Sequence, residues 1–106
     1  MATSLDFVEY IAEQVADCGA VRYKKMFGEY MVYIDEKPIL LVCDNTVFVK
    51  MLHCLDVLMK HSERGYPYKG AKEHYVLDID NTELARAVVS VLLPVTPIPV
   101  PRKKRK

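Results

Sequence analysis

The sequence feature that most constrains the fold is a series of strand-like segments between residues 21 and 50, separated by short polar interruptions. Asp35-Glu36-Lys37 and Asp44-Asn45 are polar and short enough for hairpin turns. Strands joined by such turns pair with their neighbours in antiparallel order. The series therefore predicts an antiparallel meander, whose third strand starts at Pro38 and whose fourth spans residues 46–50.

The first part of this meander, Tyr23-Lys24-Lys25-Met26-Phe27-Gly28-Glu29-Tyr30, combines aromatic side chains, two lysines and a glycine. Glycine within a strand pattern marks a bulge, a sharp bend or the close approach of another group. We expect two strands, or one sharply bent strand, pivoting at Phe27-Gly28. Two interpretations stay open: a bulge that keeps a twisted sheet wrapped around a helix, or an interaction patch formed by Lys24, Lys25, Met26, Phe27, Gly28 and Tyr30.

Apolar residues at helical spacing predict helices on both sides of the meander. The first runs from about Ser4 to Cys18, with Thr3 or Ser4 as its cap, and Gly19 supplies a left-handed residue at its end. Later segments predict a short helix at 51–61, a strand at 74–79, and a helix that a capping box at Asp80-x-x-Glu83 begins and Pro94 ends. The order α-β-β-β-β-α-β-α predicts an α+β domain, an antiparallel sheet of about five strands flanked by helices.

A second unusual patch lies in the loop at residues 62–72, which has the turn chemistry of Gly65, Pro67 and Gly70. Its aromatic and basic side chains make it a candidate binding loop. The alternative is a lid, in which the tyrosine rings cover a sheet edge and their hydroxyls reach water. The candidate residues are Tyr66, Tyr68, Lys69 and Lys72.

The net charge of +1 conceals an asymmetry along the chain. Five of the fifteen basic residues are Arg102, Lys103, Lys104, Arg105 and Lys106, so residues 1–101 hold ten basic against fourteen acidic residues, a charge of −4. Alternate prolines from Pro97 to Pro101 favour an extended polyproline arm. We therefore expect a domain at 1–94 and a flexible, proline-rich, basic tail at 95–106.

Composition places the chain among single-domain proteins of the cytoplasm. The 51% hydrophobic content is enough for a core, and no apolar segment approaches the roughly 20 residues of a membrane helix. The N-terminus shows no signal-peptide pattern. Cys18, Cys43 and Cys54 are widely spaced and are interpreted as small buried hydrophobic residues in a reducing compartment, so no metal site or cofactor is expected.

Three segments together resemble the N-terminal domain of the TfoX/Sxy family: Lys24-Lys25-Met26-Phe27-Gly28-Glu29-Tyr30, Leu41-Val42-Cys43-Asp44 and Tyr66-Pro67-Tyr68-Lys69-Gly70-Ala71-Lys72, with Tyr75 in the following strand. The resemblance covers roughly residues 5–93. It implies an α+β fold similar to the secretion-chaperone group. It also implies an association with regulators of bacterial natural competence, which promote transcription together with the cyclic-AMP receptor protein. The full-length regulators carry a second, helical C-terminal domain, whereas this chain has its basic tail.

These observations favour a non-catalytic interaction domain with a role in transcription, a protein partner and a possible homodimer surface. The alternative is direct nucleic-acid binding, with residues 102–106 on phosphates and tyrosines stacked on bases. A third hypothesis is a small enzyme or ligand pocket that uses Lys25, Glu29 or His74.

Overall fold

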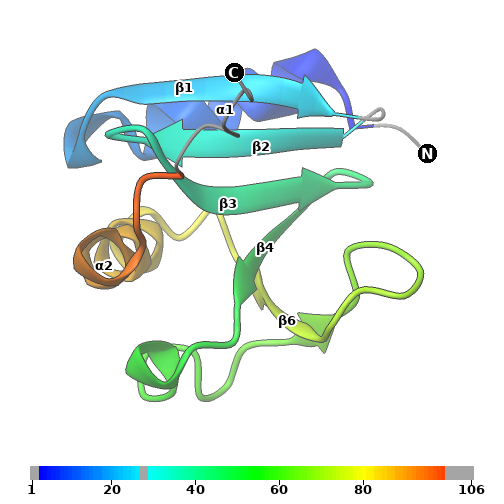
Figure 1. Ribbon diagram of the computed structural model, residues 1–106, viewed down its shortest axis with the longest axis vertical. Helices are drawn as coiled ribbons and strands as arrows, with labels where there is room; N and C mark the ends of the chain where they lie inside the picture. Colours follow the sequence, from blue (N-terminus) through cyan, green and yellow to red (C-terminus); the bar gives the residue numbers. More distant parts are fainter. Residues whose placement is uncertain (1–2, 27–28, 100–106) are drawn as a thin grey trace, which may run out of the picture.

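Six strands form one antiparallel sheet within residues 3–26 and 29–99, the part of the chain that the computed structural model describes (Figure 1). The strand order is β1-β2-β3-β4-β6-β5. The first four strands are neighbours in chain order, so the predicted meander and the α+β class are confirmed. The strands are β1 Val21–Met26, β2 Glu29–Ile34, β3 Lys37–Cys43, β4 Thr46–Lys50, β5 Arg64–Gly65 and β6 His74–Leu77.

Both predicted hairpin turns are present. Asp35 and Glu36 have φ of 53° and 67°, and Asp44 and Asn45 have φ of 53° and 54°. Positive φ at both central residues is the type I′ geometry, whose twist matches that of paired strands. These turns set the strand pairs next to them, Ile34 with Lys37 and Cys43 with Thr46.

The segment from 21 to 34 forms two strands, with Met26 opposite Glu29 in the antiparallel pairing of β1 and β2. This confirms the two-strand alternative. The expected pivot, Phe27-Gly28, lies outside the described residues. A separate register irregularity occurs between Val32 and Tyr33, where β2 pairs with β3.

Two α-helices lie in the described residues, α1 at Leu5–Gln14 and α2 at Thr82–Leu92. The Ser4 hydroxyl caps α1 by accepting from the Phe7 amide, as predicted. The cap of α2 is Asn81 rather than Asp80, because the Asn81 side chain accepts from the Leu84 amide. The expected left-handed end at Gly19 is also wrong: α1 continues as a 3₁₀ helix, η1 (Ala16–Cys18), and Gly19 has φ of 158°.

The helix expected at 51–61 is a short 3₁₀ helix, η2 (His53–Leu55), followed by turns. Its backbone bonds are mostly of the i to i+3 type, such as Leu55 to Leu52 and Ser62 to Met59. This tighter winding still buries Leu55 and Met59 completely. The predicted strand at 74–79 ends at Leu77.

One face of the sheet, here the inner face, carries the core. Its side chains form one buried cluster with residues of α1 such as Val8 and of α2 such as Val88. In Figure 1, α1 lies behind β1 and β2, on that inner side. After α2 the chain continues as a 3₁₀ helix, η3 (Leu93–Val95). No helix in the described part is long and apolar enough to cross a membrane.

Candidate functional site

The opposite face of the sheet, here the outer face, is the candidate site. Side chains alternate along each strand, and cross-strand partners lie on the same face. The pairing therefore places a mainly apolar row of side chains on the outer face, while the inner face holds both α-helices. The outer-face residues include Lys24, Met26, Glu29, Met31, Leu41, Cys43, Phe48, His74 and Val76.

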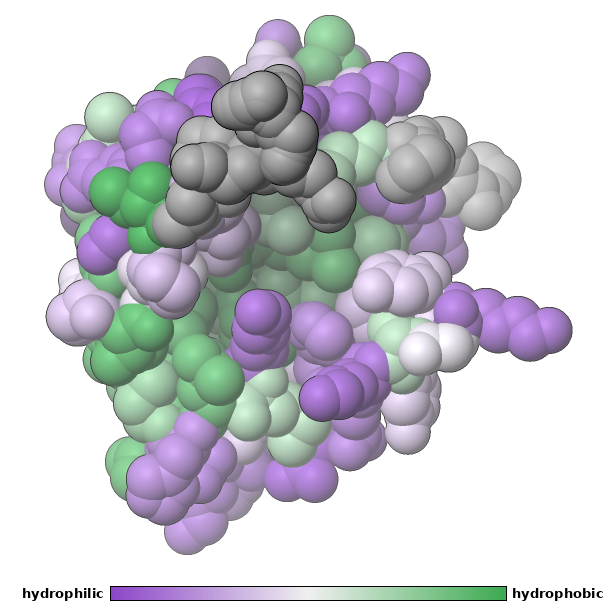
Figure 2. Space-filling view, viewed as in Figure 1, coloured by the Kyte–Doolittle hydropathy of each residue, from purple (hydrophilic) through white to green (hydrophobic). Residues whose placement is uncertain are grey.

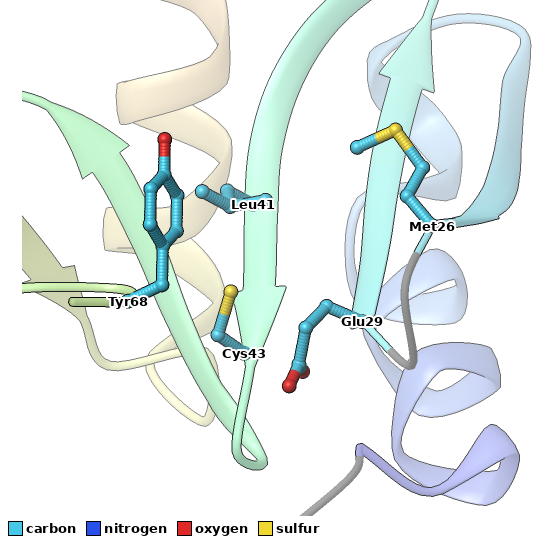
Figure 3. A pocket seen from close by; sticks show the side chains of 5 residues that line it. All are labelled: Met26, Glu29, Leu41, Cys43 and Tyr68. Atoms are coloured by element: carbon cyan, nitrogen blue, oxygen red, sulfur yellow. The ribbon is translucent and has the colours of Figure 1, made fainter. Parts of the chain in front are cut away.

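Several of these side chains line a hollow of about 510 Å³, here the outer-face hollow. Its described lining residues are Met26, Glu29, Leu41, Cys43 and Tyr68, the last from the β5–β6 loop (Figure 3). Figure 2, which views this face, shows hydrophobic surface recessed between hydrophilic side chains. The size lies within the range of about 300–1,000 Å³ that is usual for ligand pockets.

Glu29 is the only charged residue among the described lining residues. Its Oε1 accepts from the Thr3 hydroxyl at 2.7 Å and from the Asp44 amide at 3.0 Å. Thr3 is held in turn, because its Oγ1 accepts from the Asn45 amide at 3.2 Å. The β3–β4 turn and the start of α1 thus fix the position of the Glu29 carboxylate.

Cys43 forms part of the floor of the outer-face hollow and is 2% exposed. Burial raises the pKa of its thiol to about 11, and the nearby carboxylates of Glu29 and Asp44 add to the rise. A thiol with this pKa is protonated at neutral pH, and the thiolate is the nucleophilic form. Cys43 therefore acts here as an apolar wall rather than as a reactive group. The expectation that all three cysteines are buried holds for Cys43 but is wrong for Cys54, which is exposed, and Cys18 is only partly buried.

The structure brings together parts of the two predicted patches. Met26 of the first patch and Tyr68 of the second face the same hollow. Lys24 is on the same face as Met26 and is exposed. Lys25 and Tyr30 lie opposite each other on the inner side of β1 and β2, where Tyr30 is buried and its ring packs edge-on against Tyr23.

The other candidate residues of the loop are exposed, with Tyr66 and Tyr68 at 64% and 61%. Lys69 lines none of the described hollows, whereas Lys72 lines a second hollow of about 370 Å³ with Lys50 and His74. Phe27, Gly28 and the tail residues Arg102, Lys103, Lys104, Arg105 and Lys106 lie outside the described residues.

The residues of the enzyme hypothesis do not form one group. Glu29 and His74 are on the outer face, whereas Lys25 is on the inner side of β1 and is exposed. His74 Nδ1 lies 2.8 Å from the carbonyl oxygen of Lys72. Among the described residues, no three His, Cys, Asp or Glu side chains are grouped so that they could hold a metal ion.

Leu41, Cys43 and Phe48 belong to the site, but the sequence did not single them out as site residues. A signal was present in the near-continuous apolar run at 39–43. A strand with one solvated face alternates, so an unbroken run indicates apolar side chains on both faces. Both helices pack on one face, so the second apolar face is left open.

Comparison with known proteins found no family model that matches the chain. A protein of Spirochaeta aurantia, described as an uncharacterized 12.7 kDa protein in the trpE 5′ region, is 32% identical over 107 residues. The alignment covers 99% of this chain and 93% of the spirochaete protein. The chain belongs to the family of this protein. Because nearly all of both chains align, the family spans the complete α+β domain described above.

Proposed function

We propose that this protein is a non-catalytic regulatory domain of the TfoX/Sxy type that acts in the bacterial cytoplasm. In this proposal it binds a partner protein, a component of the transcription machinery, through the outer face of its sheet. One observation carries the proposal. All five described residues of the outer-face hollow come from the three segments that resemble the family: Met26 and Glu29 from the first, Leu41 and Cys43 from the second, and Tyr68 from the third.

The chemistry of the outer face supports a protein partner. Leu41 also lines a smaller hollow with Met31 and Phe48, so apolar surface continues along β3 beyond the outer-face hollow. Protein interfaces combine such an apolar centre with a polar rim, and exposed tyrosine and methionine are enriched in them. Tyr66 and Tyr68 provide aromatic rings in the loop that borders this surface.

Affinity purification from the native host tests this proposal with two matched variants. Met31→Glu places a charge on the apolar outer face, and Leu5→Glu places one on α1, where Leu5 is 48% exposed. Quantitative mass spectrometry measures the amount of each co-purified protein. We expect a partner that the wild type and Leu5→Glu bind in equal amounts and that Met31→Glu does not bind. Tyr68→Ser, in the loop, repeats the test if Met31→Glu does not fold. Equal recovery by all variants contradicts the proposal.

Nucleic-acid binding is the second candidate function. The observation that favours it is the second hollow, where Lys50, Lys72 and His74 lie together with one acidic residue, Glu73, beside the tyrosine-bearing loop. Lysines on phosphates combined with aromatic rings under bases are typical of single-strand binding. The basic tail would add five positive charges. If all five contact the phosphates of duplex DNA, log affinity should fall with log salt concentration at a slope of roughly −4 to −5.

Fluorescence anisotropy with labelled DNA at two salt concentrations separates these possibilities. The wild type is compared with a full-length variant in which each basic residue from 102 to 106 is replaced by glutamine. Binding that this replacement abolishes is nonspecific and due to the tail. Binding that survives the replacement but is lost in Lys50→Gln with Lys72→Gln favours a nucleic-acid surface on the domain. No binding by any form excludes this second candidate.

A further inference from the structure

Among its described lining residues, the outer-face hollow combines apolar walls with a single negative charge. Met26, Leu41 and Cys43 contribute sulfur and hydrocarbon surface, and Glu29 contributes a carboxylate. The charge of residues 1–101 is also negative, at −4. An occupant that matches this lining has an apolar stem and a positively charged end.

The carboxylate is held in place before any occupant arrives. Both of its hydrogen bonds in the described part of the structure, from Thr3 and from Asp44, reach Oε1. No described residue donates a hydrogen bond to Oε2. A fixed carboxylate loses little conformational freedom on binding, and such preorganisation favours affinity.

The ring of Tyr68 supplies a second group that attracts cations. Figure 3 shows this ring beside Leu41, across the hollow from Met26, with the Glu29 carboxylate at the end near the β3–β4 turn. The face of an aromatic ring attracts ammonium and guanidinium groups electrostatically. Lysine and arginine side chains bury their methylene stems on apolar surface while their charged ends reach a polar group.

From this geometry we infer that the outer-face hollow binds a lysine or arginine side chain of the partner protein. The stem lies between Met26, Leu41 and Tyr68, and the cation is bound by Glu29. This inference rests on the proposed function and names the chemistry of the partner: a basic anchor residue on the surface that covers the outer face. The acidic body of the domain favours the approach of such a basic partner.

The first test uses single-residue probes and the full chain. Nα-acetyl-lysine amide and Nα-acetyl-arginine amide are titrated into ¹⁵N-labelled protein, with the norleucine and glutamate analogues as neutral and anionic controls. We expect amide shifts centred on Glu29 and Cys43, and binding of the cationic probes about tenfold tighter than norleucine, in line with a charge-assisted hydrogen bond. Equal binding of norleucine overturns the inference.

Matched substitutions locate the effect. Glu29→Gln keeps a similar size and an acceptor for Thr3 and Asp44, and it should weaken binding of the cationic probes about tenfold or more. Tyr68→Leu should weaken binding of these probes about twofold to fivefold, because it removes the ring that packs on the stem and attracts the cation. Glu13→Gln on α1 and Tyr66→Leu in the loop are the controls and should leave binding unchanged. If Glu29→Gln does not fold, Tyr68→Leu against Tyr66→Leu still decides the result.

A further comparison identifies the occupant. If the full-length variant with glutamine at each basic position from 102 to 106 binds the probes about tenfold more tightly than the wild type, the chain's own tail fills the hollow and the inference is overturned. Unchanged affinity supports a partner side chain.

The affinity purification also distinguishes this inference from the proposed function. Loss of the partner in Met31→Glu but not in Glu29→Gln leaves the function standing and contradicts this inference.

Discussion

The reactivity of Cys43 gives a quantitative test of the outer-face hollow. Its thiol is 2% exposed, and burial together with the charges of Glu29 and Asp44 raises its pKa from 9.0 to about 11. At pH 8 a thiol of pKa 11 holds about a hundredfold less thiolate than one of pKa 9, roughly 0.001 against roughly 0.1. Because only the thiolate is alkylated and Cys43 is buried, we expect Cys43 to react far more slowly than the exposed Cys54.

Iodoacetamide labelling followed by peptide mass spectrometry measures both rates in one sample. The Cys43 rate should rise about tenfold per pH unit until the pH approaches 11. Glu29→Gln removes one of the charges that raise this pKa, so it should speed labelling of Cys43 and leave Cys54 unchanged. Cys43 labelling at pH 8 within about tenfold of the Cys54 rate would refute the described burial and charge environment.

Three further predictions concern stability. The folded Cys43 thiol keeps its proton up to about pH 11, whereas an ordinary thiol loses it near 9.0. The contribution of this thiol to the free energy of unfolding is therefore fully present below pH 9 and is lost as the pH rises through 11. Urea unfolding between these pH values should therefore show a shallower loss of stability in Cys43→Ala. Leu55→Ala should cost about 2–5 kcal/mol, whereas Leu58→Ala, at a residue 36% exposed, should cost less than about 1 kcal/mol. Gly19→Ala should lower the melting temperature, because φ is 158° and a Cβ atom would lie 2.7 Å from the Asp35 carboxylate.

The parts of the fold that the sequence predicted are those that local chemistry decides. Asp44-Asn45 was recognised as a turn because these residue types accept positive φ. The helix at 51–61 was wrong because its apolar spacing does not distinguish an α-helix from a 3₁₀ helix followed by turns: Leu55 and Met59 are buried in either case. The two-residue strand β5 is too short to show any periodicity.

The candidate site was only partly predictable for a different reason. Met26 and Tyr68 were both proposed from unusual composition, but their convergence depends on the β5–β6 loop folding toward β3. Tyr30 belongs to the same unusual sequence segment as Met26, yet the alternation of side chains along β2 places Tyr30 in the core. The face of β3 that the helices leave uncovered depends on where α1 and α2 pack. No local sequence pattern predicts this packing.

The most direct test of a role in transcription is the transcript profile of the native host after deletion of the gene. The deletion strain is complemented with the wild type, with Met31→Glu on the outer face, or with Leu5→Glu on α1. We expect deletion to change a defined set of transcripts. The wild type and Leu5→Glu should restore them, and Met31→Glu, produced at an equal level, should not. Unchanged transcripts on deletion, or full restoration by Met31→Glu, would contradict a regulatory role exerted through the outer face of the sheet.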